Sequence, residues 1–393
     1  MEFWNTIYRI TSFSYGFSWQ QALMIFFSLI LAYIAISKKK EPYLLLPLAF
    51  GMLLANIPGA KLDAYTEGGL LHLIYQGIRP TLIEVSPGVF ETVFPNPSPL
   101  YPPMIFLCLG VMTDFSPLIS NPKTIFISIC GQIGIFAAFL FAILIGKFVG
   151  GPLDFNFREA ASIAIIGGAD GPTSIFVAAK LAPELLSTVA IAAFSYMGLV
   201  PFIQPPIMKM LTTDAERLIK MKVTQPVPQR TKIIFAFSVT IGAGLLIPSG
   251  ATLVGMLMLG NIIRECGVLD RFIDTLTQHF LNLLTIFVSF AIGSSAIADY
   301  FLTAKTICVL LLGLSAFYIG TFFGVLSAKL LNLFPGAKVN PLIGNAGVSA
   351  MPMAARISQK LGQQYDKHNH LLMHAMGPLV GAIIASAVVA GIF

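Results

Sequence analysis

The apolar segment 160–179 is long enough to cross a bilayer, but a single charge, Asp170, interrupts it near its middle. A carboxylate at that depth is costly, so proteins keep one there for a functional purpose. Residues that break helices surround it: Gly167, Gly168, Gly171 and Pro172. They free backbone carbonyls and amides, which a membrane protein tolerates only where the backbone lines an internal cavity. Broken helices of this kind bind coupling ions in transporters, so the sequence predicts an ion site inside the membrane.

The rest of the chain has the composition of a polytopic membrane protein. It has 393 residues, 56% hydrophobic and only 11% charged, with a mean hydropathy of +0.82, whereas soluble domains average about 25% charged residues. Apolar runs of spanning length lie near 20–36, 43–57, 124–150, 185–211, 231–248, 280–300, 303–333 and 370–392. Shorter, broken or tilted pieces lie near 100–112, 160–179, 250–263 and 341–359. We expect an all-α polytopic membrane protein with roughly 10 to 12 membrane segments in one integral domain over 1–393.

The basic residues indicate a membrane topology and no nucleic-acid partner, although the net charge is +6. Lys38, Lys39 and Lys40 follow the first span, and residues 207–232 hold a second basic group. The positive-inside rule places both loops in the cytoplasm and the N-terminus outside, so the long loop 58–100 faces outward. No basic region or small-residue cleavage site accompanies the first span, which we therefore interpret as an anchor and not a signal peptide.

An internal repeat organises the chain, with one copy over 100–211 and a second over 250–393. Three landmarks recur in the same order: Leu107–Gly110 and Leu257–Gly260, glycine-rich breaks that begin at Gly167 and Gly344, and Met-Gly pairs that begin at Met197 and Met376. Matching discontinuous helices are the best sequence indication of a transporter's central site. We therefore expect two repeats with broken, re-entrant hairpin helices. The sequence leaves open whether the two copies are inverted.

Asp170 is the sharpest functional signal. It could instead be a helix-capping residue in an exposed loop, since Asp-Gly-Pro is also turn chemistry, but the apolar sequence on both sides argues against a solvated loop. A carboxylate beside loosened carbonyls is a hard-oxygen site that suits Na⁺. When desolvation favours the neutral acid, the same group can carry a proton.

The second break, 340–356, also carries polar residues. Asn340, Asn345 and Ser349 offer neutral oxygens, and Arg356 offers a planar cation matched to a carboxylate. The alternatives remain open: Arg356 could be a positive-inside residue at a helix end, and Asn340 could be an ordinary loop residue.

Other polar residues in or beside apolar spans are weaker candidates. Tyr196 lies inside a span, where a buried hydroxyl needs a partner, so it either joins the site or packs. Asp299, which ends another span, could be an ion relay or an interfacial residue. The histidines that begin the last span are unpromising as a metal site: His368, His370 and His374.

With these motifs in hand, the chain resembles the membrane-embedded β subunits of the sodium-pumping biotin-dependent decarboxylases, which handle oxaloacetate, glutaconyl-CoA, methylmalonyl-CoA or malonate. The resemblance covers nearly the whole chain and is most specific at 167–173 and 347–356. It implies a subunit that decarboxylates carboxybiotin and couples this to Na⁺ export while consuming a proton. The acid that the complex decarboxylates is left open.

The resemblance also implies roles for particular residues. Asp170 matches the family's essential aspartate, Tyr196 a tyrosine after the first break, and Asn340, Ser349 and Arg356 the second polar region. Asp170, Asn340, Ser349 and Tyr196 are the expected Na⁺ ligands, and Asp170, Arg356, Ser349 and Tyr196 the expected catalytic residues. Arg356 and Asn340 are expected to bind the carboxybiotin that a partner carries.

One position departs from the family pattern: Leu379 stands where the family commonly has an Asn implicated in Na⁺ binding. Either Asn340 or a backbone carbonyl replaces that ligand, or the second ion site is altered. The expected partners are a soluble carboxyltransferase and biotin-carrier subunit, a small membrane-anchoring subunit and further copies of this chain, in a prokaryotic inner membrane. A Na⁺-coupled secondary carboxylate transporter of the elevator type is the main rival interpretation.

Overall fold

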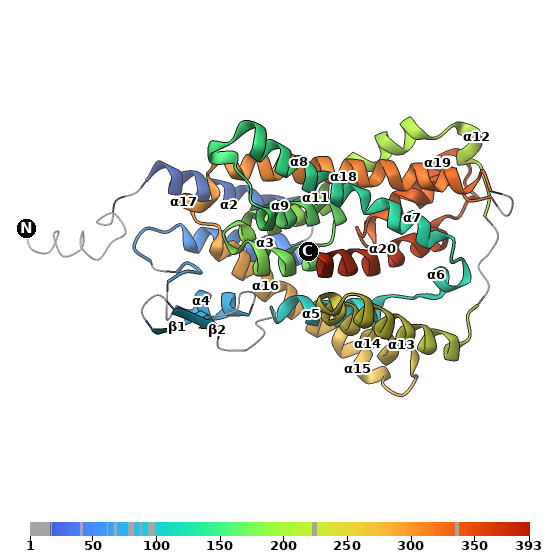
Figure 1. Ribbon diagram of the computed structural model, residues 1–393, viewed down its shortest axis with the longest axis horizontal. Helices are drawn as coiled ribbons and strands as arrows, with labels where there is room; N and C mark the ends of the chain where they lie inside the picture. Colours follow the sequence, from blue (N-terminus) through green and yellow to red (C-terminus); the bar gives the residue numbers. More distant parts are fainter. Residues whose placement is uncertain are drawn as a thin grey trace, which may run out of the picture.

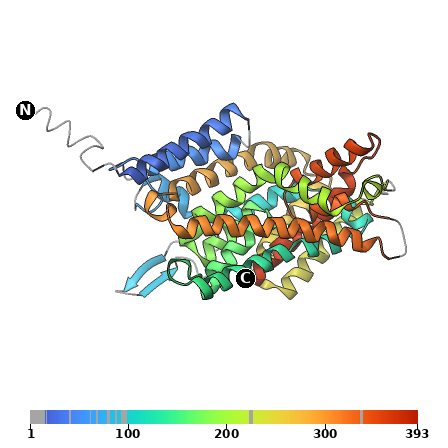
Figure 2. The ribbon, with the colours of Figure 1, turned by 90° about the horizontal axis from the view of Figure 1, so that it is seen from above.

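The computed structural model describes residues 16, 18–39, 42–60, 62–66, 69–77, 82–86, 89–92, 99–221, 226–334 and 338–393. Within these ranges the protein is a bundle of helices with one short β-hairpin (Figure 1). The loop that carries α12 lies at one end of the bundle, and the β-hairpin and α17 lie at the other (Figures 1 and 2). Lys40 and Lys222, which belong to the predicted basic loops, fall outside the described residues.

Among the residues that the structure describes, six spans are long and apolar enough to cross a membrane. They are α2 (Trp19–Ser37), α7 with α8 (Thr124–Gly131 and Ile133–Val149), α11 (Leu186–Leu211), α16 (Leu281–Ser295) with the turns before it, α18 (Ala304–Leu331) and α20 (Leu372–Ile392). Shorter helices that pack among them are α3 (Pro42–Ala55), α5 (Tyr101–Met112), α13 (Gln229–Leu246) and α14 (Ala251–Glu265). The prediction of an all-helical polytopic membrane protein is confirmed, because these elements lie where the apolar runs predicted them.

The remaining elements are short. They are α4 (Leu70–Gln76), α6 (Ser116–Ser120), α12 (Asp214–Arg217), α15 (Asp270–Asp274), α17 (Ala298–Phe301) and the strands β1 (Leu82–Ser86) and β2 (Val89–Thr92). The two strands pair in an antiparallel hairpin within the predicted outward loop. A π-helical turn, Thr275–Phe280, joins α15 to α16.

Two helix pairs pack closely through glycines. Helices α3 and α16 run parallel, and at their shared end Asn56 Nδ2 donates to the Ala296 carbonyl at 2.9 Å. In the pair α5 and α14, a Cβ on Gly110 would overlap the Leu257 carbonyl, and a Cβ on Gly260 would overlap the Leu107 carbonyl. The first landmarks of the two predicted repeats therefore contact each other reciprocally, and the repeat itself stays a prediction.

Two broken hairpins enter the bundle from opposite ends. The first consists of α9 (Phe157–Ala164), the 3₁₀ turn η3 (Ile165–Gly168) and α10 (Gly171–Leu181), and the second of the 3₁₀ segment η7 (Pro341–Gly347) and α19 (Met353–Tyr365). Glu159, near the start of the first hairpin, pairs with Lys305 at 2.7 Å at the start of α18. Both ends of the second hairpin bind the loop around α12, through Asn340 and Tyr365. Each hairpin thus enters and leaves at one end, as predicted for re-entrant segments.

Candidate functional site

The first hairpin places Asp170 at its tip because the local sequence stops one helix and starts another there. The side chain of Asn156 caps α9, which tightens into η3 and ends at Ala169 in the left-handed region, with φ 53°. Asp170 itself is extended and stands just before α10, which opens with Gly171 and Pro172. A proline suits a first helical turn because its missing N–H would have no partner there. The carboxylate therefore sits at the helix N-terminus, where the helix dipole favours negative charge.

Several oxygen atoms gather around the Asp170 carboxylate, which is only 5% exposed. Its Oδ2 accepts hydrogen bonds from Thr173 Oγ1 and, at 3.3 Å, from Ser386 Oγ on α20. Ser349 Oγ lies 3.5 Å from Ser386 Oγ. It donates at 2.6 Å to the Gly168 carbonyl, which also accepts from the Ser349 backbone N–H at 3.0 Å. The tips of the two hairpins thus meet at a cluster of carboxylate, hydroxyl and carbonyl oxygens.

This cluster borders a cavity of about 270 Å³. Asp170 and Ser349 line one side, and Asn282, Thr285 and Ser289 of α16 line another. The rest of the wall is largely apolar: Leu44, Ile105, Leu109, Pro172, Phe194, Met197, Leu281, Val288, Met351 and Ile383. Exposed Tyr43, which follows Lys38 and Lys39 in the chain, stands among the lining residues. The cavity therefore reaches toward the end that the basic loops predict to be cytoplasmic.

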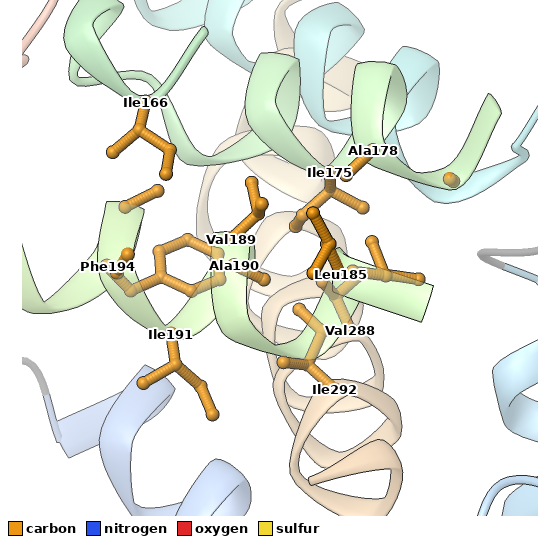
Figure 3. Close-up of a cluster of buried hydrophobic side chains, with 14 of the residues drawn as sticks. Ile166, Ile175, Ala178, Leu185, Val189, Ala190, Ile191, Phe194, Val288 and Ile292 are labelled. Carbon is orange, nitrogen blue, oxygen red and sulfur yellow. The ribbon is translucent and has the colours of Figure 1, made fainter. Parts of the chain in front are cut away.

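Apolar packing holds the tip of the first hairpin against the rest of the bundle (Figure 3). The Phe194 ring lies so close to Gly171 that a Cβ there would overlap it. Figure 3 shows Val288 and Ile292 of α16 among the same buried side chains as Leu185 and Val189. This cluster packs the first hairpin against α11 and α16.

Tyr196 is placed near the first hairpin but outside the hydrogen bonds of the Asp170 cluster. Its hydroxyl donates to the Leu310 carbonyl on α18, and its ring packs against Gly313. The residue is 6% exposed. These contacts fix α11 to α18, and a role in ion binding stays a prediction.

The polar residues of the second hairpin are mostly engaged with one another. Asn340 Nδ2 donates to the carbonyls of Arg217 and Ile219 at 2.9 and 2.8 Å, while its Oδ1 accepts from the Leu342 N–H. Asn345 Nδ2 donates to Gln204 Oε1 at 2.8 Å, and its Oδ1 accepts from Ser358 at 2.5 Å. Of the second hairpin's candidates, the structure brings Ser349 to Asp170. The part of Asn340 in binding Na⁺ or carboxybiotin stays a prediction.

Arg356 is exposed on the first turn of α19, and Lys360 follows it one turn later on the same exposed face. It is not among the residues that line the Asp170 cavity, although nearby Met351 is.

Leu379 is fully buried in an apolar cluster that includes Val348 and Phe317. Leu379, where the sequence departs from the expected family pattern, therefore packs against apolar side chains.

The structure adds two side chains to the cluster that the sequence did not single out, Thr173 and Ser386, and it shows where the weaker candidates lie. Ser386 is an isolated hydroxyl in an apolar span, a pattern that is common in membrane helices and carries no signal by itself. Asp299 is exposed on α17. Among the described residues, no group of three His, Cys, Asp or Glu side chains could hold a metal ion, and this includes the histidines near α20.

Comparison with known proteins decides the family. A family model described as the Na⁺-transporting oxaloacetate decarboxylase beta subunit matches residues 20–393. The chain belongs to this family. It is a membrane β subunit of a sodium-pumping decarboxylase, and the rival carboxylate transporter is not favoured.

Relatives named for different acids match at similar levels. The chain is 47% identical to the methylmalonyl-CoA decarboxylase subunit beta of Propionigenium modestum, over 98% of this chain and 96% of that protein. It is 48% identical to the glutaconyl-CoA decarboxylase subunit beta of Acidaminococcus fermentans, over 96% and 93%. The oxaloacetate decarboxylase beta chain of Klebsiella pneumoniae is 45% identical, over 95% and 94%. These similarities leave the acid open.

Proposed function

We propose that this β subunit decarboxylates carboxybiotin delivered by a soluble partner and uses the free energy to export Na⁺ through the Asp170 cluster. The complex would lie in a prokaryotic inner membrane, with a carboxyltransferase and biotin-carrier subunit, a small membrane-anchoring subunit and further copies of this chain. The observation that carries the proposal is the buried Asp170 carboxylate at the meeting point of two hairpin tips, beside a cavity.

The donor set at the cluster is the chemistry that Na⁺ requires. A hard cation prefers oxygen ligands, and the cluster offers the Asp170 carboxylate, the hydroxyls of Thr173, Ser349 and Ser386, and the Gly168 carbonyl. One negative charge balances one bound cation, so the loaded site is electrically neutral within the membrane. A neutral loaded site avoids the cost of an unpaired charge in a low-dielectric environment.

The cavity beside the cluster can receive a biotin ring. Its wall is apolar for the carbon and sulfur part of the ring, while Ser349 offers a hydrogen bond to the ureido group. Arg356 lies near the start of α19, and its cation attracts the carboxylate of the incoming carboxybiotin. We assign Arg356 to guiding and holding that carboxylate at the cytoplasmic mouth.

Decarboxylation breaks the bond between the carboxyl carbon and the ureido nitrogen. The electron pair stays on the nitrogen, which takes up one proton, and neutral CO₂ leaves. Asp170 can hold either a proton or Na⁺. A proton that reaches the biotin ring from this carboxylate frees the carboxylate for the ion, and in this way the two events are linked.

The experiment that tests the proposal uses the whole complex in sealed vesicles with its cytoplasmic face outward. Addition of the acid should drive radioactive sodium into the vesicles, and the uptake should cease when avidin blocks the biotin carrier. Outside pH should rise as protons are consumed. Uptake driven by a carboxylate gradient alone, without the biotin carrier, would instead support the rival transporter.

A further inference from the structure

Helix α16 has two different faces along the Asp170 cavity. Asn282, Thr285 and Ser289 line the cavity. The exposed apolar side chains Leu283, Ile286 and Phe287 flank these residues on one side of the helix. The spacing of three and four residues keeps the polar side chains in one row, which spans about 10 Å at about 1.5 Å per residue.

Ser289 is the most informative residue in this row. It is 0% exposed, and its Oγ finds no hydrogen-bond partner among the residues that the structure describes. On the same helix, Ser294 and Ser295 donate to the carbonyls of Ala291 and Ile292 at 2.7 and 2.8 Å. A buried hydroxyl without a partner is costly unless a ligand supplies one. The cavity that Ser289 lines is the place from which that ligand can come.

The other two side chains keep oxygen atoms available along the row. Asn282 Nδ2 donates to the Gln278 carbonyl at 2.6 Å, and Thr285 Oγ1 donates to the Leu281 carbonyl at 2.8 Å. Since donation uses hydrogens, the Asn282 carbonyl oxygen and the Thr285 lone pairs remain acceptors. Both residues are half-buried, while Ser289 is fully buried. The row therefore runs from the mouth of the cavity toward its buried part.

We infer that this row of α16 is the access path for Na⁺ from the cytoplasmic mouth to Asp170, with Ser289 as the last oxygen before the carboxylate. The inference rests on the proposed function, because it takes the Asp170 cluster as the ion site. A cavity of about 270 Å³ holds about nine waters at about 30 Å³ each, enough for a partly hydrated ion. The ion exchanges waters for protein oxygens one step at a time.

The neutrality of the row suits a path more than a resting site. A carboxylate along the way would trap the cation before it reached Asp170, whereas a neutral oxygen replaces one water and releases the ion again. The linear arrangement over about two helical turns also differs from what a biotin ring requires, since its ureido group needs donors and acceptors gathered at one point.

The test uses Ser289→Ala in the whole complex, with Ser295→Ala as the matched control and Ser289→Thr as the variant that keeps the hydroxyl. The Na⁺ concentration for half-maximal decarboxylation should rise about fivefold in Ser289→Ala, the effect of one lost neutral ligand. It should stay unchanged in Ser295→Ala and return toward the original value in Ser289→Thr. Thr285→Val, which keeps the side-chain shape, should give a smaller rise and serves if Ser289→Ala does not assemble.

A second measurement tests the ion site at Asp170 separately from the access path along α16. Protection of the resting complex from protease by Na⁺, measured at equilibrium without substrate, should need the same Na⁺ concentration in Ser289→Ala, because a path residue changes the rate of entry and not the final binding. It should be absent in Asp170→Asn. Normal Na⁺ protection in Asp170→Asn would overturn the proposed ion site. Loss of protection in Asp170→Asn, with an unchanged Na⁺ dependence of decarboxylation in both Ser289→Ala and Thr285→Val, would overturn the access path alone. A raised KM for carboxybiotin at unchanged Na⁺ dependence of decarboxylation would likewise overturn it and assign the row to the biotin ring.

Discussion

The two broken hairpins have similar outlines but opposite chemistry. They enter from opposite ends, and each stops in the interior and leaves at the end where it entered. Each places a proline at the start of the helix that follows its break. Two residues before that proline, the first hairpin has Asp170 and the second has the buried Ala350. The charge of the site therefore comes from one hairpin only.

Most polar residues of the second hairpin bind one another or a neighbouring loop. Asn345, Ser358 and Gln204 satisfy one another in a buried network, and Asn340 joins the hairpin to the loop around α12. A satisfied polar network in a low-dielectric interior fixes one arrangement of the chain. We infer that position at the tip, and not the number of polar residues, decides which side chains reach the proposed ion site: Asp170 in the first hairpin and Ser349 in the second.

The largest effect should follow from Asp170→Asn, which removes the charge that distinguishes the first hairpin. We expect decarboxylation and sodium uptake to be abolished while the complex still assembles, because the amide keeps the shape but cannot balance the ion. Reconstituted vesicles report both activities, and Asp299→Asn, at an exposed position, is the control. Na⁺-dependent turnover in Asp170→Asn would contradict the assignment of the ion site to the Asp170 carboxylate of the first hairpin.

A change in the Asn345 network of the second hairpin should lower the stability of the protein and leave its Na⁺ affinity unchanged. Asn345→Leu leaves Gln204 Oε1 without its donor and removes one of the three acceptors of the Ser358 hydroxyl, which costs about 1–3 kcal/mol for buried groups. Thermal unfolding in detergent should shift to lower temperature. The Na⁺ concentration for half-maximal activity of the folded fraction should be unchanged, and a rise there would show that this network also reaches the ion.

A smaller effect is expected where the last span meets the first hairpin. Ser386→Ala removes a hydroxyl bound to the Asp170 carboxylate, so the half-maximal Na⁺ concentration should rise about threefold to tenfold. Ser327→Ala is a matched control, because Ser327 is buried but binds its own helix at the Gly324 carbonyl. Equal curves for the two variants would contradict a place for Ser386 in the ion site.

The smallest change tested is Arg356→Lys on the exposed face of α19. It keeps the charge but replaces a planar fork by a point charge, so we expect the KM for carboxybiotin to rise several-fold during decarboxylation. Na⁺ should protect the variant from protease as it protects the original chain. Equal loss of both would mean that Arg356 stabilises the hairpin and does not hold the substrate.

Much of the fold could be predicted because hydropathy and helix-breaking residues act locally. The apolar run that became α2, the broken segment around Asp170 and the second break at 340–356 are each set by a few neighbouring residues. The π-helical turn before α16 and the β-hairpin were not predicted, since neither interrupts the apolar pattern in a distinctive way.

The sequence by itself determined that a membrane carboxylate stands at a broken helix, because a lone charge costs too much inside a membrane to be kept without a function, and the glycines beside it interrupt the helix. Only the tertiary structure decided which oxygens surround it. Ser386 binds the Asp170 carboxylate from 216 residues away in the sequence. Ser349 binds the Gly168 carbonyl from 181 residues away. A lone serine in an apolar helix looks the same whether it bonds to its own backbone, as Ser294 does, or faces a cavity, as Ser289 does. The difference arises from how helices distant in the sequence pack, which no local pattern encodes.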